Sequence, residues 1–320
     1  MSTITHSEPN TISSAALFLP LISGKFRPDK LWNSARFRLK FALRSAVFPV
    51  TTFHYLHQLS QLSFLPALLH SQGLLPAKPH RPYLCAGFSV AQRAQAILDH
   101  YQLMEQLADD RLRQLLLSPT NTHIASFTGK NDEQFVIDCC SGYYDREGEI
   151  TLILRYQEMT IASLSFSLIR QQQKRTLMIG GLQGPRKQVP AEVIREATKA
   201  AHGLFPKRLL MEALFILGAQ CGAEAIVAVG DDSHVFRSLR YRHSKGDKFF
   251  ASYSEFWLSL GGTARADKLF TLPLSLERKA LEEIASKKRA EYRRRYALLD
   301  TLIAQVRQAA GAERDVAHAA

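Results

Sequence analysis

The feature that most constrains the fold is the stretch from Arg175 to Tyr253, where strand-like spacing of apolar residues changes to alternating helices and strands. It begins with an apolar strand that runs into the glycine-rich segment Gly180–Pro185. Ala225–Val229, further on, is apolar throughout, as expected of a central strand buried on both faces. The glycines, acids and histidines of this stretch all stand where strands or helices end. The pattern defines a fold class and leaves the reaction open.

Two helices are predicted between these strands. The first runs from Pro190 to Ala201 and closes at Gly203, where a C-terminal glycine is expected. Pro206 begins the second helix as its first residue, and Gly222 ends it. The core-facing stripe of the second helix is formed by Leu209, Leu210, Ala213, Leu214 and Leu217.

The segment after the central strand is predicted to add a short helix and a last strand. Asp232 or Ser233 is expected to cap the short helix. Residues 249–253 are expected to form the strand.

Strand signals dominate the preceding region, from His123 to Gly181. Phe135–Ile137 and Thr151–Leu154 flank a connection over 143–148, which predicts a hairpin. Ile161–Ile169 alternates apolar residues with serines, which indicates a strand with one buried and one polar face. The serines concerned are Ser163, Ser165 and Ser167. Sequential short strands joined by turns predict an antiparallel meander.

The complete order, an antiparallel meander followed by α-α-β-α-β, is an α+β arrangement that resembles the GCN5-related N-acyltransferase fold. In that fold, backbone N–H groups at the start of the main helix bind the pyrophosphate of the acyl carrier, helped by the helix dipole. The corresponding segment here has one glycine, Gly203, and Pro206 removes one N–H donor. Lys207 and Arg208 are expected to supply positive charge there instead. Fold alone does not specify function.

Composition divides the chain into five parts. These are a loose segment at 1–30, a helical region at 31–118 with a proline-rich linker at about 66–87, an acyltransferase-like core at 119–262, a C-terminal helical extension at 263–308, and a disordered tail at 309–320. Within the helical region, Ser89 and Gln92 form a capping box that begins a helix expected to run to about Leu117.

Leu31–Leu59 is predicted to be helical with a break at Pro49. One apolar face of this helix is formed by Trp32, Ala35, Leu39, Leu43 and Ala46. The remaining surface carries the basic residues Arg36, Arg38, Lys40 and Arg44. Such a basic amphipathic helix either docks on its own domain with solvated arginines or lies on an anionic membrane.

The formal net charge is +12 and the pI is about 9.6, which favours anionic partners. The excess is concentrated in two segments, Arg36–Arg44 and Lys287–Arg295. The second lies in a helix predicted over Leu276–Gln308, where Lys288 and Arg295 fall on the same stripe as the apolar residues. Either the helix breaks near Ser286, or these two cations face the protein. Inward-facing cations need acidic partners or a bound anion such as a phosphate, an acyl carrier or a lipid headgroup.

Other basic residues of that helix, Lys287, Arg293 and Arg294, are candidates for contact with a membrane or an anion. A basic stretch by itself gives only non-specific affinity for nucleic acid. Because no reading motif accompanies it, sequence-specific nucleic-acid binding is not expected.

The glycine-rich segment is the first candidate ligand site. Gly180, Gly181 and Gly184 either let a ligand approach the backbone or form a bulge and a tight turn. Gln183 is the polar side chain among them that we expect to face any ligand.

His202 and His234 are candidate general bases, with Asp231 or Asp232 orienting the ring. The alternative is that both are hydrogen-bonded structural residues. A metal site formed by His234, His243, Asp231 and Asp232 is not expected, because the histidines lack the two-histidine spacing of a helical metal site.

The four cysteines, Cys85, Cys139, Cys140 and Cys221, lack metal-ligand spacing and are expected to be buried and reduced inside the cell. No run reaches the ~18 apolar residues needed to span a bilayer. The segment 12–22 lacks the basic start of a signal peptide. A cytoplasmic location is expected, with peripheral contact to the inner membrane left open.

Five blocks of the chain, in the same order, resemble the VirK/YbjX family of bacterial proteins over roughly residues 25–305. The blocks are Asp138–Gly148, Gly180–Pro185, Thr198–Gly203, Tyr253–Gly262 and Ser286–Asp300. Ser254 departs from the pattern, which has an acid there. The resemblance implies a Gram-negative source and an intracellular protein linked to virulence, envelope remodelling, stress response and resistance to cationic antimicrobial peptides. It supplies no catalytic residues.

Two hypotheses follow. In the first, the chain is an acyltransferase-like enzyme that acts on an envelope component at the cytoplasmic membrane face. It binds acyl-CoA or an acyl carrier protein in a groove lined by Gln183, His202, Lys207 and Asp231. In the second, it is a non-catalytic stress-response factor that binds a protein partner or an anionic membrane surface. The binding residues are those of its two basic segments, Arg36–Arg44 and Lys287–Arg295.

Overall fold

The computed structural model describes residues 14–186, 188–238 and 253–311. The chain divides into two compact units. Unit 1 comprises Met1–Arg81 and Ser89–Glu105, and unit 2 comprises Pro82–Phe88 and Gln106–Ala320.

Unit 1 is helical. Its elements are α1 (Ser14–Ser23), η1 (Lys30–Asn33), α2 (Ala35–Val47), α3 (Pro49–Ser60), α4 (Leu65–Ser71), η2 (Leu75–His80) and α5 (Val90–Glu105). The predicted break at Pro49 is confirmed, since Pro49 is the first residue of α3. The predicted capping box is confirmed too: Ser89 N donates to Gln92 Oε1 (2.8 Å), and Gln92 N donates to Ser89 Oγ (3.2 Å). The helix that begins there ends at Glu105 and does not continue to Leu117.

An aromatic cluster forms the core between α1, η1 and α2. Trp32 is fully buried, donates from Nε1 to the Gly73 carbonyl (2.7 Å), and lies edge-on to Phe41 with ring centroids 5.1 Å apart. The ring centroid of Phe18, in α1, lies 5.6 Å from that of Phe41. The cluster buries the Phe41 side of α2. The apolar face predicted within Leu31–Leu59 is therefore wrong, and of its predicted members Trp32, in η1, is the buried one.

Leu39 and Leu43, which that prediction placed in the core, are 60% and 58% exposed. Ala35 and Ala46 are exposed as well. The helix therefore presents an apolar stripe outward.

Unit 2 is built on one sheet. Its helical elements are α6 (Asp110–Leu117), α7 (Ala191–Ala200), α8 (Pro206–Gln220), η3 (Val235–Arg237), α10 (Tyr253–Ser259), η5 (Leu281–Glu283) and α11 (Ser286–Ala309). Its strands are β1 (Thr122–Thr128), β2 (Gln134–Ser141), β3 (Ile150–Tyr156), β4 (Met159–Gln171), β5 (Lys174–Gln183), β6 (Ala225–Val229), β7 (Thr263–Ala264) and β8 (Leu269–Leu272).

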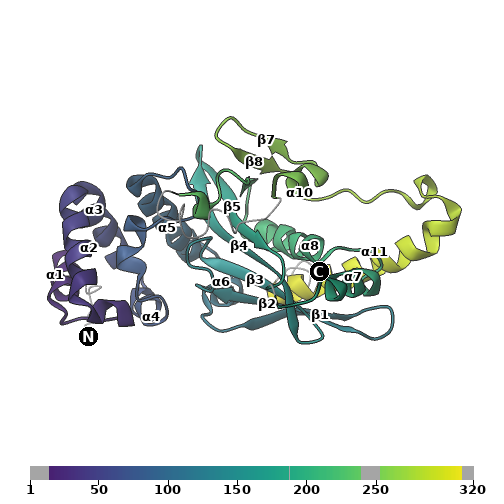
Figure 1. Ribbon diagram of the computed structural model, residues 1–320, viewed down its shortest axis with the longest axis horizontal. Coiled ribbons are helices and arrows are strands. Elements are labelled where there is room, and N and C mark those ends of the chain that lie inside the picture. The colour runs from purple at the N-terminus through teal and green to yellow at the C-terminus, as the bar shows by residue number, and fades with distance from the viewer. Residues whose placement is uncertain (1–13, 187, 239–252, 312–320) are drawn as a thin grey trace, which may run out of the picture. The chain divides into compact units, whose positions relative to one another are not determined.

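The eight strands lie in the order β1-β2-β3-β4-β5-β6-β8-β7 (Figure 1). Strands β1 to β5 form the predicted antiparallel meander, and β6 pairs parallel to β5. α8 packs against β3, β4 and β5, whereas α11 packs against β1 and α8. The α+β class and the meander are confirmed.

The predictions for α7, α8 and β6 hold in detail. Gly203 has φ +81° and its N–H bonds the Thr198 carbonyl (2.8 Å), so it ends α7 in the left-handed conformation. Pro206 is the first residue of α8, and the predicted stripe of that helix is fully buried. β6 lies between β5 and β8 and is buried from Ile226 to Val229.

The polar face predicted for β4 is wrong, because Ser163, Ser165 and Ser167 are all buried. Ser167 Oγ lies 2.8 Å from the Tyr83 hydroxyl and accepts from Glu149 N (3.0 Å). Segments of unit 2 around Tyr83 and Glu149 therefore cover this face and satisfy the serine hydroxyls.

The C-terminal third also differs from expectation. Residues 249–252 lie outside the described part of the chain, and Tyr253 begins α10 in place of a strand. His234 caps η3, through Nδ1, in place of Asp232 or Ser233. The helix predicted over Leu276–Gln308 is wrong before Ser286, where α11 begins, so the break near Ser286 that was left open as an alternative is present.

The four cysteines are buried and unpaired, as predicted. None of the helices in the described ranges is long and apolar enough to cross a membrane.

Candidate functional site

The carboxyl end of β5 contains a β-bulge at Gly180. Ser165 pairs with Gly181 and Phe166 pairs with Ile179, so Gly180 has no partner on β4. A Cβ atom at Gly180 would lie 2.0 Å from the Glu147 carbonyl oxygen, and one at Gly181 would lie 2.1 Å from Glu147 Oε2. These two predicted ligand-binding glycines therefore make room for the chain at Glu147.

Glu147 is the centre of a buried polar cluster, which we call the Glu147 cluster: Glu147, Gln183, His234 and Tyr253. Gln183 Nε2 donates to Glu147 Oε1 (2.6 Å), and His234 Nε2 lies 3.4 Å from the same oxygen. Glu147 and His234 are 1% and 0% exposed. Within the described residues, Glu147 Oε2 has no hydrogen-bond partner. Gln183 thus faces the carboxylate.

The tautomer of His234 follows from its neighbours. Its Nδ1 accepts a hydrogen bond from Phe236 N (3.2 Å), so the ring proton of the neutral form is on Nε2, toward Glu147. The ring centroids of His234 and Tyr253 lie 5.4 Å apart. Burial, and then the charge of Glu147, raise the pKa of Tyr253 well above its usual range. Its hydroxyl accepts from Leu182 N (3.3 Å), which ties α10 to the end of β5.

Asp231 serves the backbone of α10. Its carboxylate accepts from Tyr253 N (2.7 Å) and from Ser254 N (3.3 Å), so it caps that helix. The carboxylate that lies beside the His234 ring, 3.4 Å from Nε2, is that of Glu147. The carboxylate beside the histidine is therefore one that sequence reasoning did not select.

A cavity of about 540 Å³ lies where β5, α7, α8 and α10 meet, and we call it the α8 pocket. Its lining is largely apolar, formed by Ile161, Gly184, Pro185, Ile194, Phe205, Pro206, Lys207, Arg208, Glu255, Phe256, Ser259 and Leu260. Gly184 is the one predicted ligand-binding glycine that lines it; a Cβ there would have no atom within 4 Å.

Lys207 is the cation that distinguishes this pocket. Its Nζ lies 5.8 Å from the Phe256 ring centroid and 6.0 Å from that of Tyr253, a cation–π arrangement. Burial lowers the pKa of Lys207, and the negative charge of Asp231 partly offsets this. The neighbouring Arg208 is engaged by Glu212, to which Nε and Nη2 donate at 2.9 Å and 2.8 Å. Glu212 therefore neutralises the charge of Arg208, and Lys207 is the pocket cation whose charge is less fully paired.

His202 lies in a different environment from His234. It has φ +53° at the end of α7, and its carbonyl accepts from Arg295 Nε (2.9 Å). Burial, followed by the charge of Arg294, lowers its pKa. The structure therefore does not bring His202 into the Glu147 cluster or the α8 pocket.

The basic residues of α11 separate into two groups. Arg295 is half-buried and stacks on Tyr292, with its guanidinium 4.3 Å from the ring centroid. Lys287, Lys288, Arg293 and Arg294 are exposed. Of the two cations on the predicted stripe, Lys288 is exposed, whereas Arg295 faces the protein and donates from Nε to the His202 carbonyl.

The basic residues of α2 divide in the same way. Arg38 Nη1 donates to the carbonyls of Trp32 (2.7 Å) and Asn33 (3.1 Å), and Arg44 Nη1 donates to the carbonyl of His80 (3.2 Å). Arg36 and Lys40 are exposed.

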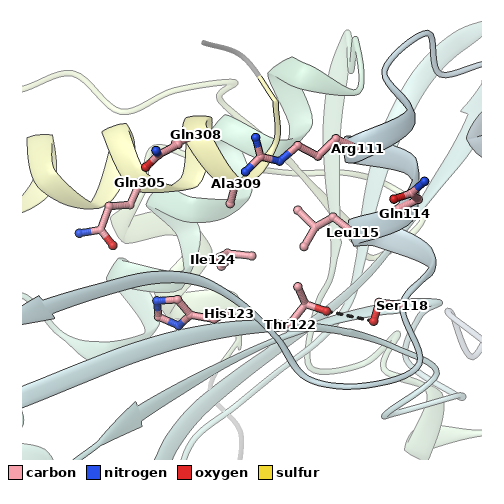
Figure 2. Close-up of a pocket in the computed structure, with 10 residues that line it drawn as sticks. All are labelled: Arg111, Gln114, Leu115, Ser118, Thr122, His123, Ile124, Gln305, Gln308 and Ala309. Atoms are coloured by element: carbon pink, nitrogen blue, oxygen red, sulfur yellow. Dashed lines mark hydrogen bonds between the residues drawn. The ribbon is translucent and has the colours of Figure 1, made fainter. Parts of the chain in front are cut away.

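A second cavity, of about 560 Å³, lies between α6, β1 and α11 and was not foreseen. Figure 2 shows Arg111, His123 and Gln305 around it, with Thr122 Oγ1 donating to Ser118 Oγ (3.0 Å). Gln305 also joins α11 to β1, because it bonds both the N–H and the carbonyl of Ser126 (2.7 and 2.6 Å).

Metal binding has no support in the described ranges, which contain no group of three or more His, Cys, Asp or Glu side chains able to hold an ion. His243 lies outside those ranges.

Sequence reasoning missed Glu147, Tyr253 and Phe256 as neighbours of the candidate site. Glu147 stands in one of the blocks that resemble a known family, and Tyr253 and Phe256 stand in another; this was the available signal. None of the three has a spacing that identifies its partner.

The comparisons with known proteins agree on one family. The model described as "Protein of unknown function (DUF535)" matches residues 30–308. The uncharacterised protein YbjX of Escherichia coli (strain K12) is 42% identical over 306 residues, covering 95% of this chain and 92% of YbjX. An uncharacterised protein of Haemophilus influenzae is 30% identical over 223 residues, covering 69% of this chain and 72% of its own. No solved structure matches the chain. The protein therefore belongs to the VirK/YbjX family, the group that the DUF535 model describes.

Proposed function

We propose that this protein binds an acyl thioester in the α8 pocket and transfers its acyl group, as an acyltransferase-like enzyme. The observation that carries the proposal is the apolar cavity of about 540 Å³ with Lys207 in the first turn of α8. The pocket includes Gly184, directly after β5, which pairs parallel to β6. In open α/β sheets, ligands bind outside the carboxyl ends of parallel strands, and the end of β5 beside β6 is the equivalent place in this mostly antiparallel sheet.

The lining suits a ligand with two unlike ends. Phe205, Phe256 and Leu260 favour a hydrocarbon chain, which they would remove from water. The start of α8 carries partial positive charge, and Lys207 adds a full charge beside it. Pro206 contributes no N–H group. We infer that Lys207 substitutes for the missing donor toward the phosphate groups of an acyl carrier such as coenzyme A.

The order of elements also supports the proposal. A bulged strand, two helices and a parallel strand follow one another as β5, α7, α8 and β6, which resembles the GCN5-related N-acyltransferase order. Tyr253 of the Glu147 cluster adjoins the pocket, because its ring centroid lies 6.0 Å from Lys207 Nζ. The acceptor that we propose is an envelope component reached at the cytoplasmic membrane face.

The test is a thermal-shift titration of the full chain with coenzyme A, acetyl-CoA and a long-chain acyl-CoA. A ligand that binds only the folded state stabilises it, by about 2.7 kcal/mol when the ligand concentration is 100 times Kd. Tm rises as a result. We expect a saturable shift that is largest for the long chain, because the pocket is apolar. Release of free thiol on adding an acceptor then measures transfer.

Two variants make the test specific. Lys207→Ala should remove most of the coenzyme A shift, whereas Lys288→Ala, an exposed cation on α11, should leave it unchanged. A flat titration with every thioester, or an equal loss in both variants, would rule out the pocket as an acyl-carrier site.

A further inference from the structure

The outward face of α2 combines apolar and basic side chains that the proposed acyl-carrier site does not use. Leu39, Leu43 and Val47 are 60%, 58% and 69% exposed. At about 100° per residue, these three residues together with Arg36 and Lys40 lie within an arc of about 100°. We call these five residues the α2 face.

The α2 face is a surface of the folded unit and not a poorly packed core. The opposite side of the same helix holds Phe41 and Ser45, which are 2% and 1% exposed. Phe41 packs on Trp32 and Phe18, so rotating the helix inward would break the aromatic cluster. The apolar stripe therefore stays exposed while the helix keeps its core contacts.

The apolar surface continues past the end of α2. Val50, in the first turn of α3, is 84% exposed, and Phe48 between the two helices is 41% exposed. Exposed apolar residues in succession mark an interaction surface, whereas single ones need no explanation.

The charge around this face identifies the class of partner. Between Glu8 and Asp99 the sequence has one acidic residue, Asp29, whose carboxylate accepts from Leu31 N (2.7 Å). The same stretch contains ten basic residues, namely Lys25, Arg27, Lys30, Arg36, Arg38, Lys40, Arg44, Lys78, Arg81 and Arg93. A second copy of this chain would bring like charges together, so self-association through the face is disfavoured.

We propose that the α2 face docks unit 1 on an anionic lipid bilayer. Leu39, Leu43 and Val47 enter the boundary between headgroups and acyl chains, and Arg36 and Lys40 bind lipid phosphates. An amphipathic helix with a basic polar flank binds a bilayer in this way, through buried apolar area and attraction to anionic lipid. This inference is independent of the acyl-carrier site, because it uses only residues of unit 1.

Only some of the basic residues of α2 are available to bind lipid. Arg38 and Arg44 hold backbone carbonyls inside unit 1, so they support the helix and do not face the lipid. α11 provides the contrast: Lys287 and Arg294 are exposed, but along Ser286–Ala309 no large apolar side chain is exposed. A basic face without apolar residues gives only salt-sensitive attraction.

The experiment is vesicle flotation of the full chain, with vesicles of phosphatidylcholine alone and of phosphatidylcholine mixed with phosphatidylglycerol. We expect flotation with the anionic vesicles only. Arg36→Glu with Lys40→Glu should reduce the partition coefficient about tenfold or more, since each basic side chain near an anionic surface contributes roughly fivefold. Leu43→Ser with Val47→Ser should also reduce it about tenfold or more, through lost apolar burial.

Two matched controls carry substitutions on unit 2. Leu274→Ser removes an apolar side chain that is 50% exposed, and Lys287→Glu with Arg294→Glu reverses two exposed charges. Both should float as the unaltered chain does. Because all substituted side chains are exposed, circular dichroism and Tm should stay unchanged in every variant.

A label at Val47→Cys gives a second readout. The native cysteines are all buried, so the new thiol is the one that reacts with an environment-sensitive dye. Its emission should shift to the blue with anionic vesicles. Flotation that survives Leu43→Ser with Val47→Ser, or an equal loss in the α11 control, would overturn the proposal. So would a concentration-dependent dimer that the same double variant abolishes, in the absence of flotation.

Discussion

Gly181 and Glu147 are in such close contact that a Cβ atom at Gly181 would lie 2.1 Å from the Glu147 carboxylate oxygen Oε2. The absence of a side chain on β5 is therefore what lets a buried carboxylate reach Gln183 and His234. The glycine pair and the acid belong to one packing arrangement, although Gly181 follows Glu147 by 34 positions in the sequence.

Gly181→Ala should destabilise unit 2. The new methyl group has to displace the Glu147 carboxylate, and forcing extra atoms into a packed site costs about 1–3 kcal/mol. Urea unfolding followed through Trp257, in a Trp32→Phe background, reports unit 2 because the chain has two tryptophans and the other lies in unit 1. Gly184→Ala is the matched control, since a Cβ there has no atom within 4 Å and should cost almost nothing. Equal effects at both positions would contradict the contact.

Glu147→Ala should reduce the cost of Gly181→Ala. Removing the carboxylate eliminates the atoms that the methyl group meets, so the two changes should be coupled by about 1 kcal/mol or more. The double-mutant cycle in urea measures this coupling directly. Strict additivity would show that the two side chains do not compete for the same space.

Arg295→Ala should lower the stability of unit 2 by about 1–2 kcal/mol, because it removes a charge-assisted hydrogen bond to the His202 carbonyl and a stacking contact. The hydrogen bond is 2.9 Å long, and the guanidinium lies 4.3 Å from the Tyr292 ring centroid. Arg294→Ala, next to it and exposed, should change the unfolding free energy by less than about 0.5 kcal/mol. The prediction fails if the two variants unfold alike.

Unit 1 should lose stability in mild acid. Burial, and then the charges of Arg44 and Arg93, lower the pKa of His80 from 6.5 to about 4. Between these two pH values the unfolded chain binds a proton that the folded unit does not, so stability falls as the pH drops from 6.5 toward 4 and is unaffected by this residue above that window. His80→Gln should flatten this slope. Trp32 fluorescence in a Trp257→Phe background measures it, and an unaltered slope would assign the effect to another group.

Local rules were sufficient where a residue's role depends on its own neighbours in sequence. Ser89 and Gln92 bond each other's backbone, Gly203 ends α7 with a positive φ, and Pro206 begins α8. Each depends on backbone geometry over a few residues, which the sequence specifies. The same holds for the fully apolar β6, because only a strand buried on both faces tolerates that composition.

Local rules failed where two faces of one element were both suitable for burial. α2 offers Leu39 and Leu43 on one side and Phe41 on the other, and contact with Trp32 and Phe18 selected the aromatic side. β4 offers apolar residues on one side and serines on the other, and both became buried because Tyr83 and Glu149 supply hydrogen bonds. The partner of such a face comes from a distant part of the chain.

The candidate site was determined by both levels. The sequence by itself identified the glycine-rich end of β5, His234 and Lys207, since all stand where regular elements end. Only the tertiary structure decided that Gly181 faces Glu147, that Gln183 binds its carboxylate, and that Lys207 lines an apolar pocket while His202 lies elsewhere. The physical reason is that burial and charge pairing depend on which atoms meet in space, and residue spacing records only which atoms are close along the chain.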